Sequence, residues 1–347
     1  MRHHVAGGCS HRGVVAGCCG VLLAGLPCAA TAQAPSPATA IRTPVESHAR
    51  LRVQSLLACP TTLDQIGRVV IPVEINGRGP FRFVIDTGAN HSTVSPALVR
   101  AVGLPVSLKD RVNLEGVTGS HAMPAVKIKS LRAGSLVIRD TYAPVLSTPM
   151  MAGADGILGI AGLRNITLLV NFEHNRVQIA RYLRPDVRFD YSRVHTEVVA
   201  GGLMAIPAYV GDVRALAIID TGSERTLGNA ALRNILHMRH APGTPEPITF
   251  VYGATRQVEI GRLMTSPPIA VGPLRVLGAA MIFGNFHIFK VWGLQNRPAL
   301  IVGMDVLGTV RALGFDFPQH DLFVAGARQA SRAAFRARTY QTSSAIH

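Results

Sequence analysis

One segment of the chain occurs twice, at a spacing of 134 residues. Residues 83–89 read FVIDTGA, and residues 217–223 read AIIDTGS. Upstream, each copy has an apolar run with a proline, a short turn and a second apolar run that ends at an aspartate. This pattern predicts a β-hairpin that presents Asp86 in one half and Asp220 in the other. Two copies of one sequence unit favour the same fold. The 347-residue chain is therefore predicted to consist of two related halves flanked by terminal segments.

The two halves continue in the same order. Ser95 and Asn229 precede short apolar-periodic segments and predict the N-caps of two helices. Extended segments with a glycine tip follow at residues 114–119 and 248–253. Each half closes with an apolar-apolar-Gly motif and two short strands, which predicts an all-β fold with short helices. The predicted closing segments are residues 157–159, 168–172 and 177–179 in the first half, and residues 301–303, 313–317 and 322–324 in the second.

The N-terminus has the pattern of a secretory signal peptide. A short basic start precedes an apolar segment at residues 14–26, and Ala30-Thr31-Ala32 supplies a cleavage signal. A membrane-anchoring helix is the alternative, but the apolar segment is short and rich in glycine. A lipoprotein-like box ends at Cys18, with too little apolar sequence before it. We therefore expect an exported protein, periplasmic or secreted, in which residues 33–58 are a removable pro-segment or a linker.

The predicted domains follow from the repeat and these terminal signals. They are a signal peptide at 1–32, a leader or linker at 33–60, an N-terminal lobe at 61–184, a C-terminal lobe at 195–325 and a basic flexible tail at 326–347.

Cysteine content and charge narrow the class of protein further. Four of the five cysteines lie in the predicted signal peptide, so only Cys59 remains and the mature chain has no intramolecular disulfide, which suggests a bacterial protein. Cys59 has no nearby histidine or asparagine motif, and a buried or incidental thiol explains it better than a nucleophile. The net charge is +15, but the arginines are scattered singly, which argues against a nucleic-acid surface. After the signal peptide no apolar stretch is long enough to span a membrane.

The doubled apolar-apolar-Asp-Thr-Gly motif, each copy followed by apolar-apolar-Gly, resembles the aspartic protease family in its pepsin-like and retroviral branches. The resemblance covers about residues 65–325. It implies two pseudo-symmetric β-barrel lobes with an active site at their junction, where Asp86 and Asp220 are catalytic. The lobe length and the missing disulfides place the chain nearer a tandem retropepsin. It also implies an endopeptidase without metal or cofactor, acting on peptides or unfolded proteins as a monomer.

The chemistry of two adjacent carboxyl groups supports this activity. Two carboxylates about 3 Å apart cannot both ionise, so Asp86 and Asp220 would hold one proton between them. The ionised member would take a proton from water, and the protonated member would donate to the developing oxyanion. The sequences of the two loops differ at Ala89 and Ser223. Because a serine there could donate to its aspartate, we predict that Asp220 is the more readily ionised member.

The resemblance assigns supporting roles to the residues beside the aspartates. The hydroxyls of Thr87 and Thr221 would form hydrogen bonds across the lobe junction. Gly88 and Gly222 would permit unusual backbone angles and donate N–H groups to the carboxylates. The apolar-apolar-Gly segments would pack beneath the active-site loops.

The glycine-tipped hairpins are candidate flaps that would close over a peptide. Tyr252 would be a flap tyrosine, or simply a core or surface tyrosine. The candidate flap residues are Gly116, Val117, Thr118, Gly119, Val251, Tyr252 and Gly253.

Other chemistries have less support in the sequence. His237 and His240 have no glutamate between them and no third ligand in view, so solvated side chains explain them better than a zinc site. Asp155 and Asp305 lie near the glycine motifs, where capping a turn is a simpler role than catalysis. The main alternative function is a non-catalytic periplasmic module that binds peptides. A dimer in which each chain supplies one aspartate is unnecessary, because one chain already carries both.

Overall fold

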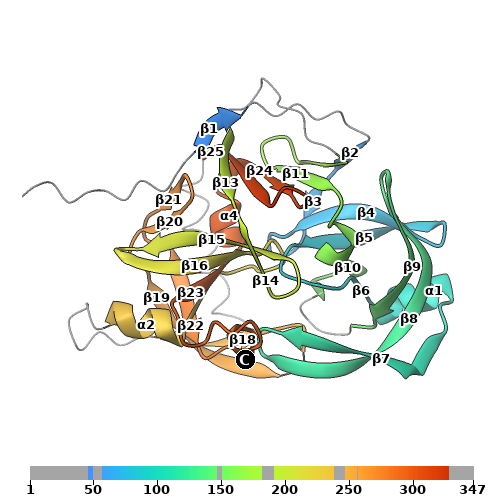
Figure 1. Ribbon diagram of the computed structural model, residues 1–347. Helices are drawn as coiled ribbons and strands as arrows, with labels where there is room; N and C mark the ends of the chain where they lie inside the picture. The colour runs from blue at the N-terminus through green and yellow to red at the C-terminus, as the bar shows by residue number, and fades with distance from the viewer. Residues whose placement is uncertain are drawn as a thin grey trace, which may run out of the picture. The chain divides into compact units, whose positions relative to one another are not determined.

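The computed structural model describes residues 46–49, 57–146, 151–181, 191–237, 247–255 and 257–327 (Figure 1). The predicted signal peptide and residues 328–347 of the predicted tail lie outside the described residues, as does His240. The described residues fold mostly into β-strands with a few short helices, which confirms the predicted all-β class. They form three sheets, one in each half and one shared by both.

The first half builds an eight-stranded sheet around the strand that ends at Asp86. β4 and β5 form the predicted hairpin, and β10 lies parallel to β5 with Gly159 opposite Asp86. The 3₁₀ helix η2 (Ile160–Gly162) follows β10, and α1 (Pro96–Val102) begins at Ser95, whose Oγ accepts from Leu98 N at 3.1 Å. The strands in sheet order are β6 (Thr93–Val94), β10 (Gly156–Gly159), β5 (Arg78–Asp86), β4 (Val69–Ile75), β8 (Gly119–Ala133) and β7 (Val106–Gly116), with β3 (Thr62–Leu63) beside β4 and β9 (Leu136–Pro144) beside β8.

The second half builds a ten-stranded sheet with the same central arrangement. β15 and β16 form the hairpin before Asp220, and β23 lies parallel to β16. Asn229 caps α2 as predicted, since its Oδ1 accepts from Leu232 N at 2.9 Å. The strands in sheet order are β18 (Ile248–Tyr252), β19 (Val258–Thr265), β22 (Ala280–Gly284), β17 (Leu227–Asn229), β23 (Ala299–Val302), β16 (Val213–Ile219), β15 (Leu203–Val210), β20 (Ile269–Val271) and β21 (Leu274–Val276), with β14 (Glu197–Val199) beside β15. The helices are α2 (Ala230–His237), α3 (His287–Val291) and α4 (Met304–Leu307).

A third, seven-stranded sheet joins the two halves. Its centre is the antiparallel pair β11 and β24, in which Leu169 lies opposite Gly314. The closing strands of each half therefore pair with those of the other half instead of completing two separate lobes. The strands in sheet order are β1 (Glu46–Ala49), β13 (Tyr191–His195), β25 (Asp321–Ala327), β24 (Val310–Asp316), β11 (Thr167–Asn171), β12 (Arg176–Ala180) and β2 (Leu57–Pro60).

The shared sheet includes strands from segments that were predicted to be a leader, a connection between the lobes and a tail. The predicted leader at 33–60 contains β1 and β2, and β2 pairs with β12. β13, between the two predicted lobes, pairs with β25, and β25 continues two residues into the predicted tail. These segments form strands because each pairs with a strand that is distant in the sequence. Such a partner cannot be recognised from the local sequence alone.

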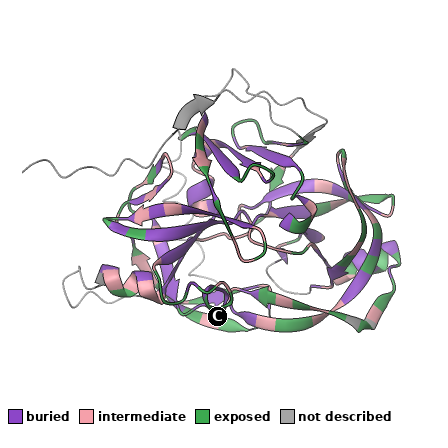
Figure 2. Ribbon diagram, viewed as in Figure 1, coloured by how far each residue is buried: buried purple, intermediate pink, exposed green. Residues whose placement is uncertain are grey.

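Buried residues are concentrated in the strands and continue from one half into the other (Figure 2). One core cluster includes Phe83, Phe283 and Phe315, one from each of the three sheets. The strand ends that carry the aspartates are therefore anchored in a shared core.

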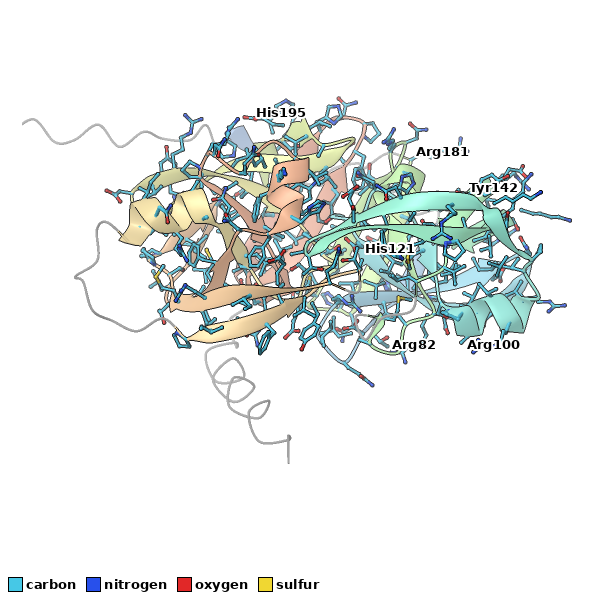
Figure 3. All side chains as sticks on the ribbon, turned by 90° about the horizontal axis from the view of Figure 1, so that it is seen from below. Arg82, Arg100, His121, Tyr142, Arg181 and His195 are labelled. Carbon is cyan, nitrogen blue, oxygen red and sulfur yellow. The ribbon has the colours of Figure 1, made fainter. Side chains whose placement is uncertain are left out.

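The positive charge is spread over the surface of the described residues. Arg82 on β5, Arg100 on α1 and Arg181 after β12 are exposed and lie apart from one another (Figure 3). No described helix has the length and apolar character needed to cross a membrane.

Candidate active site

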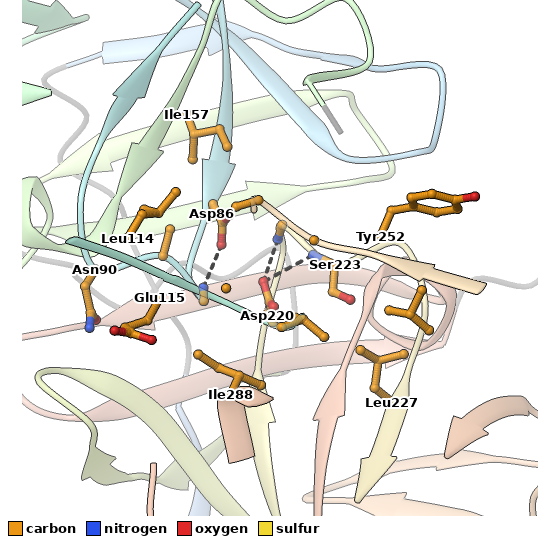
Figure 4. A pocket seen from close by; sticks show the side chains of 18 of the residues that line it. Asp86, Asn90, Leu114, Glu115, Ile157, Asp220, Ser223, Leu227, Tyr252 and Ile288 are labelled. Atoms are coloured by element: carbon orange, nitrogen blue, oxygen red, sulfur yellow. Dashed lines mark hydrogen bonds between the residues drawn. The ribbon is translucent and has the colours of Figure 1, made fainter. Parts of the chain in front are cut away.

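Asp86 and Asp220 lie at the ends of β5 and β16 and meet between the two halves (Figure 4). A Cβ atom on Gly88 would overlap the Asp220 carboxyl group, and one on Gly222 would overlap the Asp86 carboxyl group. Each carboxyl group therefore packs against the glycine of the other half. Neither glycine has a positive φ angle, so the requirement for glycine comes from this close approach and not from the predicted backbone angles.

Backbone N–H groups hold each carboxyl group in its own loop. Gly88 N donates to Asp86 Oδ1 at 2.8 Å, and Gly222 N donates to Asp220 Oδ1 at 2.8 Å. Ser223 N adds a longer bond of 3.2 Å to Asp220. These bonds orient both carboxyl groups toward the same space.

Thr87 and Thr221 connect the two loops through a reciprocal set of hydrogen bonds. The hydroxyl of each accepts from the backbone N–H of the other and donates to a backbone carbonyl in the opposite half. Both threonines are buried. The position of one aspartate is therefore fixed relative to the other.

The apolar-apolar-Gly motifs support these loops at equivalent places. Gly159 ends β10, and Gly303 follows β23. A Cβ atom on either glycine would lie within 3.0 Å of backbone carbonyl oxygens in the loop that follows the aspartate of the same half. Ser92 Oγ accepts from Gly159 N at 3.2 Å, and Thr226 Oγ1 accepts from Gly303 N at 3.2 Å. In each half only a glycine lets the strand come this close to the loop, which explains why both copies of the motif end in glycine.

Asp155 and Asp305 have structural partners. Asp155 Oδ2 accepts from Arg82 N at 2.8 Å, and Asp305 Oδ1 accepts from the Thr226 hydroxyl at 2.6 Å. Burial raises the pKa of Asp305. Both carboxyl groups therefore stabilise the loops through hydrogen bonds, and neither lines the cavity.

The two aspartates have different electrostatic surroundings. Burial raises the pKa of both carboxyl groups, and the neighbouring negative charge of Asp86 raises the pKa of Asp220 further. A hydrogen bond from Asp220 and the positive charge of Arg68 act in the opposite direction on the pKa of Asp86. Burial and the charge of Asp86 therefore favour the protonated form of Asp220, whereas the charge of Arg68 favours the ionised form of Asp86.

These directions are opposite to those expected from the prediction for Ser223, and the hydrogen bond on which that prediction rests is not formed. The Ser223 hydroxyl donates to the backbone carbonyl of Arg225 at 2.8 Å, so it is turned away from Asp220. The sequence showed a possible donor but not the direction of its side chain. Arg68, which the sequence analysis did not single out, instead distinguishes the two sides.

A cavity of about 570 Å³ surrounds the two carboxyl groups. Its walls are mainly apolar, with polar side chains from the loops after each aspartate, and both hairpin tips contribute to it. Asp86 is partly exposed to this space, and Asp220 is 8 % exposed. Apolar wall residues include Leu114, Ile157, Leu227, Ile282, Ile288 and Trp292. A cavity with apolar walls and two central carboxyl groups suits an extended organic substrate with a reactive polar centre.

The two candidate flaps meet tip to tip. Thr118 Oγ1 lies 3.0 Å from Thr255 Oγ1, and both residues are buried. On the first hairpin, β7 and β8 turn at Val117 and Thr118, as predicted. The β7–β8 hairpin also bonds to the second half, because Glu115 Oε2 lies 2.8 Å from His287 Nε2.

The tip of the second hairpin lies further along the chain than predicted. Val251 and Tyr252 belong to β18, and the turn begins at Gly253. A Cβ atom on Gly253 would contact the backbone N atoms of Val117 and Thr118, while one on Gly116 would contact Ala254 N. The flap tips therefore correspond at a spacing of 137 residues, from Thr118 to Thr255, and not at 134. Val251 is buried, and Tyr252 is 55 % exposed and points away from the aspartates (Figure 4).

The described residues contain no group of three or more histidine, cysteine, aspartate or glutamate side chains placed to hold a metal ion. Cys59 lies in β2, at an edge of the shared sheet. The side chain of His237 and all of His240 lie outside the described part of the chain.

Comparison with known proteins gives one family match. A family model described as aspartyl protease matches residues 71–161, a segment that includes Asp86, the first flap and β10. None of the curated proteins compared with the chain matches it. The family match supports an aspartic protease and, in general terms, a protease-type function.

Proposed function

We propose that this chain is an aspartic endopeptidase that hydrolyses peptide bonds with a water molecule activated between Asp86 and Asp220. The observation that carries the proposal is the reciprocal packing of each carboxyl group against the glycine of the other half. The threonine hydrogen bonds hold this arrangement in place before any substrate binds. Such preorganisation is what an acid–base pair needs in order to act on one bound water.

The asymmetry of the pair assigns the proton transfers. Ionised Asp86 accepts a proton from the water, whose oxygen attacks the carbonyl carbon of the peptide bond. Protonated Asp220 donates its proton to the carbonyl oxygen, which gives a neutral tetrahedral intermediate. The proton held by Asp86 then moves to the amide nitrogen, the carbon–nitrogen bond breaks, and Asp220 recovers its proton from the collapsing hydroxyl group. The products are a carboxylic acid and an amine.

The cavity walls and flaps supply binding and exclude bulk water. Two flap tips that meet through Thr118 and Thr255 cover the site from both halves. A peptide must therefore enter while the tips are apart and react when they close. The apolar walls would take substrate side chains, and the central carboxyl groups would face the bond to be cut.

We further propose that the chain acts as an exported monomer. The signal-like N-terminus supports export, and the presence of both aspartates in one chain supports a site that needs no second copy. Size-exclusion chromatography with light scattering, together with fractionation of the native host cells, tests these two points.

A cleavage assay on an unfolded protein tests the catalytic proposal. Wild type, Asp86→Asn and Asp220→Asn are compared between about pH 3 and pH 7, a range in which such a pair can hold a single proton. Each variant should lose at least about 10³-fold in kcat/KM, and a statine-type inhibitor should block the wild type.

The outcomes separate the two functions. Cleavage that neither substitution affects would refute the mechanism. Peptide binding without any cleavage by the wild type would favour the non-catalytic binding module.

A further inference from the structure

We propose that Arg68 is a positioning residue that keeps Asp86 ionised, so that Asp86 is always the member that accepts the proton of the attacking water. The inference rests on the proposed peptidase function and deepens it, because it assigns different roles to two aspartates that the repeat makes look equivalent. It begins from the strand register beside each aspartate.

The register places a different residue opposite each aspartate. In the first hairpin Val70 pairs with Val84, and the same register continued by two residues places Arg68 opposite Asp86. In the second hairpin Ala205 pairs with Ile218, and the same continuation places Leu203 opposite Asp220. Residues opposite each other on antiparallel strands have side chains on the same face, close enough to interact. One aspartate therefore has a cationic neighbour and the other a fully buried leucine.

Arg68 is built into the protein as a buried ion pair. Its side chain is 2 % exposed, and Arg68 Nε donates to Asp64 Oδ2 at 2.7 Å. The other oxygen, Asp64 Oδ1, accepts from the backbone N–H groups of Ile66 and Arg68. Arg68 also donates to the carbonyl of Met151 at 3.4 Å. A buried arginine of this kind is costly unless it is fully paired, and here several contacts hold it in one place.

The two partners of the ion pair are placed differently relative to the cavity. Of the two partners, Arg68 is the one that lines the cavity, together with Asp86. The carboxylate of Asp64 is bonded to its own turn and does not line the cavity. Consistent with this placement, the charge of Arg68 lowers the pKa of Asp86, against the larger effect of burial.

The other ionisable groups around the cavity are less able to distinguish the two aspartates. Each is at least partly exposed, where solvent screening weakens its field. Glu224 and Arg225 also pair with each other at 3.3 Å, and Glu115 pairs with His287. These ionisable lining residues are His91, Glu115, Glu224, Arg225 and Tyr252.

The test removes both charges of the buried pair together, so that neither charge is left buried without the other. The double variant Asp64→Asn/Arg68→Leu places at position 68 the residue type found at Leu203, whereas Arg68→Lys keeps the charge. Arg193→Leu is a control for the loss of an arginine–carboxylate pair elsewhere in the protein, because the partly exposed Arg193 pairs at 2.7 Å with the buried Asp321 in the shared sheet. All three variants are first shown to be folded by circular dichroism and thermal unfolding.

The decisive readout is the acidic limb of the pH profile of kcat/KM. It should move to higher pH by about one unit in the double variant, the effect of losing one nearby opposite charge. It should stay at the wild-type position in Arg68→Lys and in Arg193→Leu, even where these variants are less stable. An unchanged limb in the folded double variant would overturn the proposal.

A second measurement works even if the wild type cleaves no peptide. The Asp86 carboxyl carbon can be followed by NMR through a pH titration of ¹³C-labelled protein, with its signal assigned by its loss in Asp86→Asn. Its midpoint should rise in the double variant and not in the Arg193→Leu control. If cleavage is absent but this shift occurs, the proposed function fails and the role of Arg68 stands. If cleavage occurs without the shift, the role of Arg68 fails alone.

Discussion

Thr87 and Thr221 satisfy each other's backbone: Thr221 N donates to Thr87 Oγ1 at 3.0 Å, and Thr87 N donates to Thr221 Oγ1 at 3.1 Å. Each hydroxyl then donates to a carbonyl of the opposite half at 2.7 Å, Thr87 to Ile219 and Thr221 to Ile85. Four hydrogen bonds thus join the halves at the point where the aspartates meet.

Replacing one hydroxyl of this set should destabilise the protein. Thr221→Val leaves Thr87 N and the carbonyl of Ile85 buried without this partner, at a cost of about 2–4 kcal/mol in the free energy of unfolding. Thr221→Ser keeps the hydroxyl and should lose less than about 1 kcal/mol. Urea unfolding of both variants measures the difference. Equal stabilities for valine and serine would show that the hydrogen bonds contribute nothing.

Adding one methyl group at Gly222 should disable the site. In Gly222→Ala the new Cβ would overlap the Asp86 carboxyl group, which must then move. Because small displacements of reacting groups cost about 10²-fold in rate, we expect kcat to fall by about that factor or more. Gly326→Ala is the control, since nothing lies within 4 Å of its added Cβ. Wild-type kcat in folded Gly222→Ala would contradict the packing described.

Separating the flap tips should weaken substrate binding. Thr118→Val removes the hydroxyl that lies 3.0 Å from Thr255 Oγ1. The closed flaps lose about 1 kcal/mol, so KM should rise about fivefold with a smaller change in kcat. Thr118→Ser should behave like the wild type in steady-state kinetics. A valine variant with an unchanged KM, or with a loss confined to kcat, would speak against tip-to-tip closure.

Removing the charge of Asp220 should stabilise the protein at neutral pH. The pKa of Asp220 in the folded chain lies well above 3.8, mainly because of burial. The folded state therefore binds a proton more tightly than the unfolded state, and stability falls as pH rises through this window. Asp220→Asn avoids that loss. Its Tm at pH 7 should exceed the wild-type Tm by about 2–4 °C, the shift expected for about 1 kcal/mol in a domain of this size.

The same comparison near pH 3 supplies the control. There the wild-type carboxyl group is protonated in both states, so the difference in Tm should disappear. An advantage of Asp220→Asn that is equally large at both pH values would mean that it arises from packing and not from ionisation.

The parts of the fold that were predicted from the sequence depend on local or repeated patterns. Both hairpins before the aspartates, the Ser95 and Asn229 caps and the glycine motifs follow from alternation, capping and the repeat, and the structure contains them. The pairing of β11 with β24 was missed, because it joins strands that are more than 130 residues apart and their own sequences do not specify a partner.

The parts of the site that were predicted correctly are those in which the two copies of the repeat match residue for residue. The repeat indicated the paired Asp-Thr-Gly loops, but the turn of the second hairpin is longer than that of the first, and its tip lies three residues further along the chain than the repeat predicts. The role of Ser223 was wrong because a hydroxyl can turn to either of two acceptors, and here it bonds to Arg225. Arg68 gave no signal in the sequence because it lies outside the repeated Asp-Thr-Gly motif, and the equivalent place in the second copy holds Leu203.

The difference between Arg68 and Leu203 has a consequence for how a peptide can lie in the cleft. A peptide has a direction, and two identical half-sites could not tell its amino end from its carboxyl end. A homodimer of either half would have such identical half-sites, whereas one polypeptide encodes the residue beside each acid separately. The guanidinium beside one acid and the leucine beside the other thus make the two acids unlike, so a peptide bound in one direction is not equivalent to the same peptide bound in the other.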